Sequence, residues 1–195
     1  VVAIDFGTKS TVVVFQDEDS KILPMRVGTG NISKSIQAKH YENPTVIEFH
    51  DLKQFMDAYA ASKGRPATHW EDVCISHKAV DDLQSSCSTD YGAFLSGLKQ
   101  WAGDTGVKRA IRMRDRANRD FLLQQYRELS ENDLDPIELY AYYLGLYINN
   151  MRNGIFLNYY LSFPVTYEIA VRDRIIRSFQ RGIKKSLPRP ILDDE

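Results

Sequence analysis

The sequence predicts an α/β fold. Its first 27 residues contain short apolar and β-branched runs separated by polar turns, which is the pattern of strands. From residue 135 onward, a long helix pattern, a short apolar run and a second amphipathic helix pattern follow one another. Because helices and strands alternate along the chain, we expect an α/β architecture.

The N-terminal segment is typical of strands joined by tight turns. A short apolar run ends in Asp5, and Gly7 lies among small hydroxyl residues directly after it. The predicted strands are residues 1–5, 11–15 and 21–27, with turns at 6–10 and 16–20 and a loop at 28–31. Strand, tight turn and strand at residues 1–15 would form a hairpin.

The middle of the chain is predicted to mix short strands and helices. In chain order, the predictions are a strand at 45–49, a helix at 52–61, a strand at 73–76, and helices at 77–84 and 93–102. Gly103 is expected to end the last of these helices. The strongly basic segment 108–119 is interpreted as a solvated helix or a partly mobile segment.

The clearest helix begins at Asp135-Pro136, because Asp is a favoured N-cap and Pro a favoured first helical residue. Apolar residues then recur at helical spacing as far as Met151. Residues 155–163 are predicted to form a buried strand that Pro164 stops. Residues 168–185 repeat the amphipathic helical pattern.

Composition gives no global reason to expect nucleic acid or a membrane as a partner. The formal net charge of the 195 residues is -1, and 43% of them are hydrophobic. No apolar run approaches the roughly 18 residues of a membrane span. Asp115 interrupts the basic segment, which favours a solvated or partner-facing surface there.

The cysteines and histidines do not predict a metal centre. Only Cys74 and Cys87 are present, which fits a reducing cytosol, so a cytoplasmic location is expected. None of the four histidines shows metal-ligand spacing with either cysteine, and we expect no zinc site.

The N-terminal hairpin contains residue types that suit a phosphate ligand. Gly7 allows close approach of the backbone, and the hydroxyls of Thr8, Ser10 and Thr11 could add hydrogen bonds. Asp5 at the end of the first strand is suited to organise a magnesium ion through its waters. The alternative is an ordinary hairpin with a polar turn.

Ile4-Asp5-Phe6-Gly7-Thr8-Lys9-Ser10-Thr11 resembles the first phosphate motif of the actin, sugar-kinase and heat-shock ATPase superfamily. Three later segments follow in the order found in DnaK-type chaperones. They are the strand Asn43-Pro44-Thr45-Val46-Ile47-Glu48-Phe49, the helix around Gly97-Leu98-Lys99, and the Asp135-Pro136 helix with the strand leading to Pro164-Val165-Thr166-Tyr167. Arg172 lies where the family has an Arg.

The resemblance implies the N-terminal lobe of an actin-like ATPase domain, spanning residues 1–195. Such a lobe has a ribonuclease-H-like mixed sheet flanked by helices and a smaller inserted α/β subdomain. The core would comprise residues 1–27 and about 130–195, and the insertion about 28–130. Because the family's second glycine-rich phosphate loop is not matched, we expect the chain to be a piece of a longer protein.

The same resemblance implies a nucleotide site. Asp5 would coordinate hydrated magnesium and help to order the attacking water. Gly7, Thr8, Lys9 and Ser10 would form the turn against the β- and γ-phosphates. Lys99 would be the catalytic lysine that reaches the γ-phosphate.

Some of these roles have alternatives. Lys99 could instead be a surface residue of an amphipathic helix, and Lys53 and Lys78 are competitors for its role. The family usually has a hydroxyl residue at position 9, so Lys9 either strengthens phosphate binding or indicates altered or lost hydrolysis.

The function implied is that of a DnaK-like ATPase lobe. Its partners would be ATP or ADP with Mg²⁺ and a second ATPase lobe in the parent chain, with client or co-chaperone proteins as further candidates. The parent would be the enzyme, and the lobe alone would be inactive. The alternatives are a lobe of a small-molecule kinase of the superfamily and a non-catalytic relative that binds partners or forms filaments.

Overall fold

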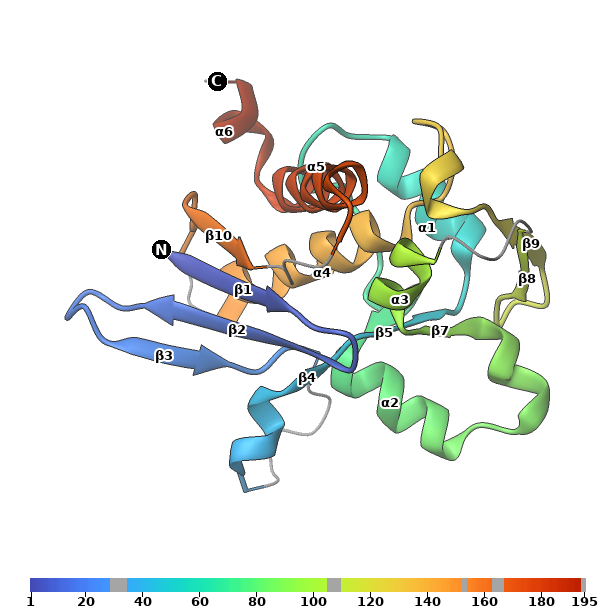
Figure 1. The fold of residues 1–195 in the computed structure, drawn as a ribbon, viewed down its shortest axis with the longest axis horizontal. Helices are drawn as coiled ribbons and strands as arrows, with labels where there is room; N and C mark the ends of the chain where they lie inside the picture. The colour runs from blue at the N-terminus through green and yellow to red at the C-terminus, as the bar shows by residue number, and fades with distance from the viewer. Residues whose placement is uncertain (29–34, 105–109, 152–153, 163–166, 194–195) are drawn as a thin grey trace.

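The chain has a mixed α/β structure (Figure 1). The computed structural model describes residues 1–28, 35–104, 110–151, 154–162 and 167–193. Figure 1 shows the N-terminal strands on one side of the molecule and a second, smaller sheet on the other, with two long helices beside the first sheet. The α/β class predicted from the sequence is therefore confirmed.

The first sheet contains the N-terminal strands and one strand from the C-terminal part. Its strands are β1 (Val2–Phe6), β2 (Ser10–Gln16), β3 (Ile22–Met25), the short β4 (Asn43–Pro44) and β10 (Tyr159–Ser162). The order is β10-β1-β2-β3, and β4 pairs with β2 beside its start. Strand β10 runs parallel to β1, whereas β1, β2 and β3 are antiparallel neighbours.

Strand β10 is shorter and more exposed than the sequence predicted. It covers four residues of the predicted 155–163 segment, and position 163 lies outside the described residues. Tyr160 is 67% exposed, because among the described strands β10 lies at an edge of the sheet. The apolar run therefore predicted the strand correctly, but the prediction that the strand is buried was wrong.

Two long helices pack against each other and against β1. They are α4 (Pro136–Met151) and α5 (Ile169–Ser186), and both agree with the predicted spans to within a residue. Phe6 of β1 lies between them, with ring centroids 6.1 Å from Tyr140 of α4 and 5.0 Å from Phe179 of α5. Asp135 caps α4 as predicted, accepting hydrogen bonds from the N–H groups of Ile137 and Glu138.

The second sheet has the order β6-β5-β7 and lies within the predicted insertion. Its strands are β5 (Val46–Phe49), β6 (Val73–Ile75) and β7 (Phe94–Ser96), and α1 (Leu52–Ala60) and α2 (Ser76–Ser85) follow β5 and β6 in the chain. These strands and helices agree with the predictions for residues 45–84.

The predicted helix at residues 93–102 is wrong in its first half. Residues 94–96 form β7, which pairs with β5, and only α3 (Leu98–Gly103) is helical. Gly97 separates them with φ 66° and ψ 35°, a left-handed conformation that Gly adopts without strain. Pairing with an open strand edge thus overrode the local helical pattern.

The basic segment is a hairpin and not a helix. It forms β8 (Ile111–Arg114) and β9 (Asp120–Leu123), joined by a turn in which Asn118 has a positive φ. Its arginines are paired with carboxylates: Arg112 and Arg114 with Asp120, Arg116 with Glu48 and Asp90, and Arg119 with Asp51. Arg114 and Arg112 hold the pKa of Asp120 well below its ordinary value. Lys108 and Arg109 lie outside the described residues.

A continuous hydrophobic core joins both sheets to the helices. Tyr140, Tyr142 and Tyr143 of α4 are fully buried and belong to this core. The remaining short helices are η1 (Ala38–Tyr41), η2 (Ser88–Ala93), η3 (Tyr126–Glu128) and α6 (Arg189–Asp193). No helix in the described part of the chain is long and apolar enough to cross a bilayer.

Candidate functional site

The turn between β1 and β2 is the centre of the predicted site. Phe6 and Thr11 are the last paired residues of the two strands, so residues 7–10 make the reversal. A Cβ atom on Gly7 would lie 2.1 Å from the carbonyl oxygen of Ser10, so the turn has no room for a side chain there. Lys9 is exposed, and Thr8 and Ser10 are half-buried. Groups of the turn are therefore accessible to a ligand.

Thr45, directly after β4, holds the turn in place. Its hydroxyl donates to the carbonyl of Gly7 (3.0 Å), and its backbone N–H donates to the carbonyl of Lys9 (3.0 Å). The hydroxyls of Thr11 and Thr45 are 2.9 Å apart. Both ends of the turn are therefore bonded to one residue that lies more than 30 positions away in the chain.

Asn43 supports the same region from within the core. Its side-chain NH₂ donates to the carbonyl oxygens of Thr11 and Met25, and its Oδ1 accepts from the N–H of Val27. The residue is fully buried, and these bonds satisfy its amide. From the sequence, residues 43–49 were matched to a strand of the chaperone family, but Asn43 and Thr45 were given no role. The signal that could have identified them is the presence of two polar residues at the start of an apolar run.

Asp5 lies at the end of β1, exposed and beside β10. Ser162, its register partner on β10, donates a hydrogen bond from its hydroxyl to Oδ1 of Asp5 (2.6 Å). This bond fixes one carboxylate oxygen. A carboxylate in this position is suited to bind the waters of a magnesium ion, and its chemistry fits that predicted role.

Lys99 reaches the hairpin from α3. Its side chain is buried, with the residue 5% exposed, and its Nζ donates to the carbonyl oxygen of Phe6 at 2.6 Å, 93 positions earlier in the chain. Burial lowers the pKa of Lys99, and the nearby carboxylate of Asp5 acts in the opposite direction. The structure thus brings Lys99 to Asp5 and the start of the turn, and a surface role is wrong.

Tyr167, in the C-terminal part of the chain, holds α3 in place. Tyr167 donates a hydrogen bond from its hydroxyl to the carbonyl of Lys99 (3.0 Å). Its ring lies over Gly103, where an added Cβ would be 2.8 Å from a ring carbon. The hydrogen bond and the ring contact together hold α3 against Tyr167, and the ring contact requires Gly at position 103.

The two competing lysines are engaged elsewhere. Lys53 on α1 forms an exposed ion pair with Asp57, and Lys78 on α2 forms a half-buried ion pair with Asp82. Lys9, at the tip of the turn, has no side-chain partner among the described residues. Of the lysines considered from the sequence, Lys99 and Lys9 are therefore those at the hairpin.

A cleft of about 640 Å³ adjoins α3. Gly97, Lys99, Trp101 and Tyr167 contribute to its lining, and none of the described hairpin residues does. The cleft thus borders α3 and not the described part of the hairpin.

Two other parts of the family resemblance, residues 164–166 and Arg172, contribute no observed contact to the hairpin. Pro164, Val165 and Thr166 lie outside the described residues. Arg172 is half exposed on α5, with its Nε 3.8 Å from the carboxylate of the adjacent Asp173. The structure does not bring Arg172 into contact with the hairpin residues that it describes.

A second group of polar side chains was missed entirely. Glu48, His50, Cys74 and Asp82 come together in the second sheet, each offering one ligand atom within 4.8 Å of the others. The sequence prediction considered only linear spacing of His and Cys, and it found no metal site. Strand pairing provides the proximity, because Glu48 and Cys74 are directly opposite each other on β5 and β6.

Comparison with known proteins gives no identification. No protein-family model matches the chain, and no curated protein matches it.

Proposed function

We propose that the chain is the first lobe of a DnaK-like domain that binds and hydrolyses ATP with Mg²⁺. The observation that carries the proposal is the buried Lys99, whose ammonium group bonds to the Phe6 carbonyl at the start of the turn. A buried lysine beside a carboxylate and a glycine turn is a suitable arrangement for a phosphate chain and its metal ion.

The fold supports the proposal at a coarser level. A mixed sheet in which β10 runs parallel to β1, with β2 and β3 antiparallel beside them, is consistent with a ribonuclease-H-like lobe. The long helices α4 and α5 flank this sheet, and the second sheet lies within residues 28–130, as an inserted subdomain would.

In this mechanism each group has a separate task. The N–H groups and hydroxyls of residues 7–10 would hold the β- and γ-phosphates, and Asp5 would orient the waters of Mg²⁺. The Lys99 ammonium offsets negative charge that spreads over the γ-phosphate oxygens in the transition state. Since Lys99 now bonds to a backbone carbonyl, it must turn toward the nucleotide when the phosphates bind.

Replacing Lys99 by Ala in the complete ATPase is expected to lower kcat by about 100-fold or more, with a smaller change in nucleotide affinity. Lys99→Arg is expected to restore part of the rate, because it keeps the charge but not the shape of the ammonium group. The matched control is Lys53→Ala, an exposed lysine on α1 that should leave the rate unchanged. A Lys99→Ala enzyme with the parental rate of phosphate release would refute the catalytic role.

Titration of Mg²⁺ and ATP into the isolated chain is expected to give binding weaker than micromolar and negligible turnover. The physical reason is that a nucleotide sandwiched between two lobes loses the contacts of the second lobe when that lobe is absent. Isothermal titration calorimetry would measure the affinity. Micromolar binding by the isolated chain would contradict the two-lobe arrangement.

Lys9 favours a second candidate, a non-catalytic relative that binds nucleotide without efficient hydrolysis. Its exposed ammonium group lies at the turn where the family usually has a hydroxyl residue. A permanent positive charge there would strengthen phosphate binding in the ground state but would not raise the rate of hydrolysis. Under this alternative, phosphate release by the complete protein stays at background and Lys99→Ala does not change it, whereas nucleotide affinity falls in Lys9→Ala.

A further inference from the structure

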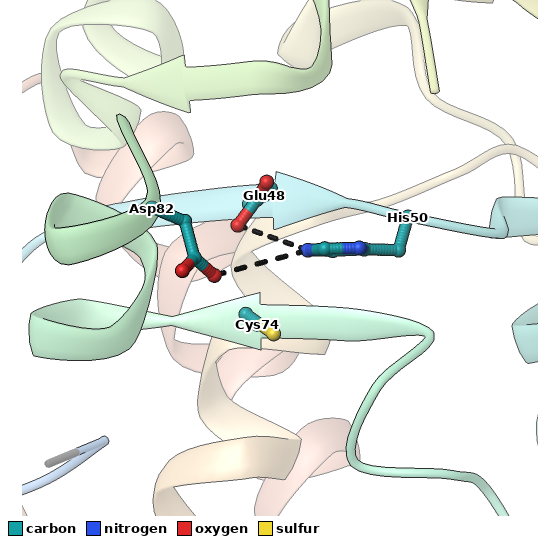
Figure 2. A group of neighbouring side chains, drawn as sticks. All are labelled: Glu48, His50, Cys74 and Asp82. Atoms are coloured by element: carbon teal, nitrogen blue, oxygen red, sulfur yellow. Dashed lines mark ion pairs between the residues drawn. The ribbon is translucent and has the colours of Figure 1, made fainter. Parts of the chain in front are cut away.

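The cluster of Glu48, His50, Cys74 and Asp82 lies on one face of the second sheet (Figure 2). Glu48 is in the middle of β5, His50 directly follows that strand, and Cys74 is on β6. Asp82 approaches from α2, and Figure 2 shows its carboxylate directed toward the imidazole of His50. The end of β5 and the consecutive elements β6 and α2 thus contribute side chains to a common point.

Two buried atoms in the cluster lack a hydrogen-bond partner in the described part of the chain. They are Oε2 of Glu48 and Nε2 of His50. The two atoms are 3.0 Å apart, yet their alignment is not that of a hydrogen bond. Glu48 is fully buried, and a buried carboxylate oxygen that contacts an imidazole without hydrogen-bond alignment is costly.

We propose that Glu48, His50, Cys74 and Asp82 form a structural zinc site. Thiolate, imidazole and carboxylate groups are the ligands that Zn²⁺ takes in four-coordinate sites. Zinc bonds of about 2.1 Å in tetrahedral geometry separate neighbouring ligand atoms by about 3.4 Å. The observed separations of Nε2 of His50 from Glu48 and Asp82, 3.0 and 3.9 Å, lie on either side of that value.

The surroundings fit a fixed metal site. Arg116 donates to Oε1 of Glu48 (2.8 Å), which leaves Oε2 for the ion and orients the carboxylate. The backbone of His50 is held on both sides, by bonds to the carbonyl of Asp72 and from the N–H of Ala117. Sites on paired strands are positioned more accurately than sites on loops.

Two features compete with zinc and define what must change on binding. Lys78 contacts both carboxylate oxygens of Asp82 and has to release one of them. The imidazole of His50 directly contacts the carboxylates of Glu48 (3.0 Å) and Asp82 (3.9 Å), and zinc has to come between these groups. The site joins β5, β6 and α2, and zinc there would stabilise this subdomain independently of any nucleotide.

The test uses the chain freed of metal by a chelator and titrated with Zn²⁺ or Co²⁺ alone. We expect one equivalent to bind, and Co²⁺ to produce the near-ultraviolet charge-transfer absorption of a thiolate ligand. Cys74→Ser should abolish that absorption and weaken zinc binding by about 100-fold or more. The matched control is Cys87→Ser, since Cys87 is an exposed free thiol outside the cluster and its removal should change neither result.

A second measurement covers the case in which Cys74→Ser does not fold. In the unsubstituted chain, zinc should slow alkylation of Cys74 and leave that of Cys87 unchanged, as read by mass spectrometry. Failure to bind one equivalent, absorption that persists in a folded Cys74→Ser variant, or alkylation of Cys74 that zinc does not slow would each overturn the proposal. Loss of nucleotide hydrolysis has no bearing on these readouts, so the two proposals can fail separately.

Discussion

Replacing Gly182 by Ala is expected to lower the free energy of unfolding by about 3 kcal/mol or more. Gly182 lies where α5 crosses α4, and an added Cβ would be 2.2 Å from the carbonyl oxygen of Glu138 and 2.8 Å from the backbone nitrogen of Tyr142. These are backbone atoms within a helix, so no flexible side chain can move aside. The helices must separate, and their shared contacts with β1 are lost.

Chemical denaturation followed by circular dichroism would measure this effect. The matched control is Gly92→Ala, because a Cβ there meets no atom closer than 3.7 Å and should change stability by less than about 0.5 kcal/mol. Equal stability of Gly182→Ala and the parent would mean that α4 and α5 are less closely packed than in the structure. The separation of α4 and α5 also concerns the candidate site, since Phe6 lies between Tyr140 and Phe179 immediately before the turn.

Replacing Asp135 by Ala is expected to cost about 3 kcal/mol of stability. Loss of an N-cap costs about 1 kcal/mol, and buried donors left without an acceptor add about 1–3 kcal/mol. Asp135 is 8% exposed, and besides capping α4 it accepts from the hydroxyl of Ser178 (2.5 Å) and from Arg181 (2.9 Å). Ser178 is in turn 2.8 Å from the hydroxyl of Tyr126, so one substitution disturbs a connected group of buried polar side chains.

Urea denaturation of three variants would test this prediction. Asp135→Asn should have an intermediate effect, because the amide oxygen can still cap the helix but carries no charge for Arg181. Asp57→Ala is the control, as its exposed i,i+4 pair with Lys53 is expected to contribute less than about 0.5 kcal/mol. If Asp135→Ala lost no more stability than Asp57→Ala, the buried polar group would not be important for the fold.

Local sequence signals predicted the parts of the fold in which neighbouring residues decide the conformation. The Asp135-Pro136 start, the apolar positions of α5 and the β-branched run of β2 gave elements that agree with the structure to within a few residues. These patterns are reliable because capping, helical periodicity and strand alternation act over a few residues. Where a segment joined an existing sheet edge, as β7 did after the left-handed Gly97, the local pattern was misleading.

The sequence named residues that the structure brings to the hairpin, but it did not name the residues that support the turn. A glycine turn after a strand ending in Asp5 was visible in the sequence, and the structure brings Lys99 to it as the resemblance implied. Thr45 and Asn43 were missed as the supports of that turn, because their hydrogen bonds link residues 16–38 positions apart. Such bonds depend on which strands pair, and no short motif records that pairing.

The sequence by itself determined the α/β class, the two long helices and the hairpin at residues 5–11, since each depends on interactions within one segment. Only the tertiary structure decided what lies next to the hairpin and what surrounds His50. The Glu48–Cys74 register of β5 and β6 and the approach of Asp82 on α2 follow from packing between distant segments. Because burial is also a property of the whole fold, only the folded chain shows that Lys99 is enclosed and that Oε2 of Glu48 lacks a hydrogen-bond partner among the described residues.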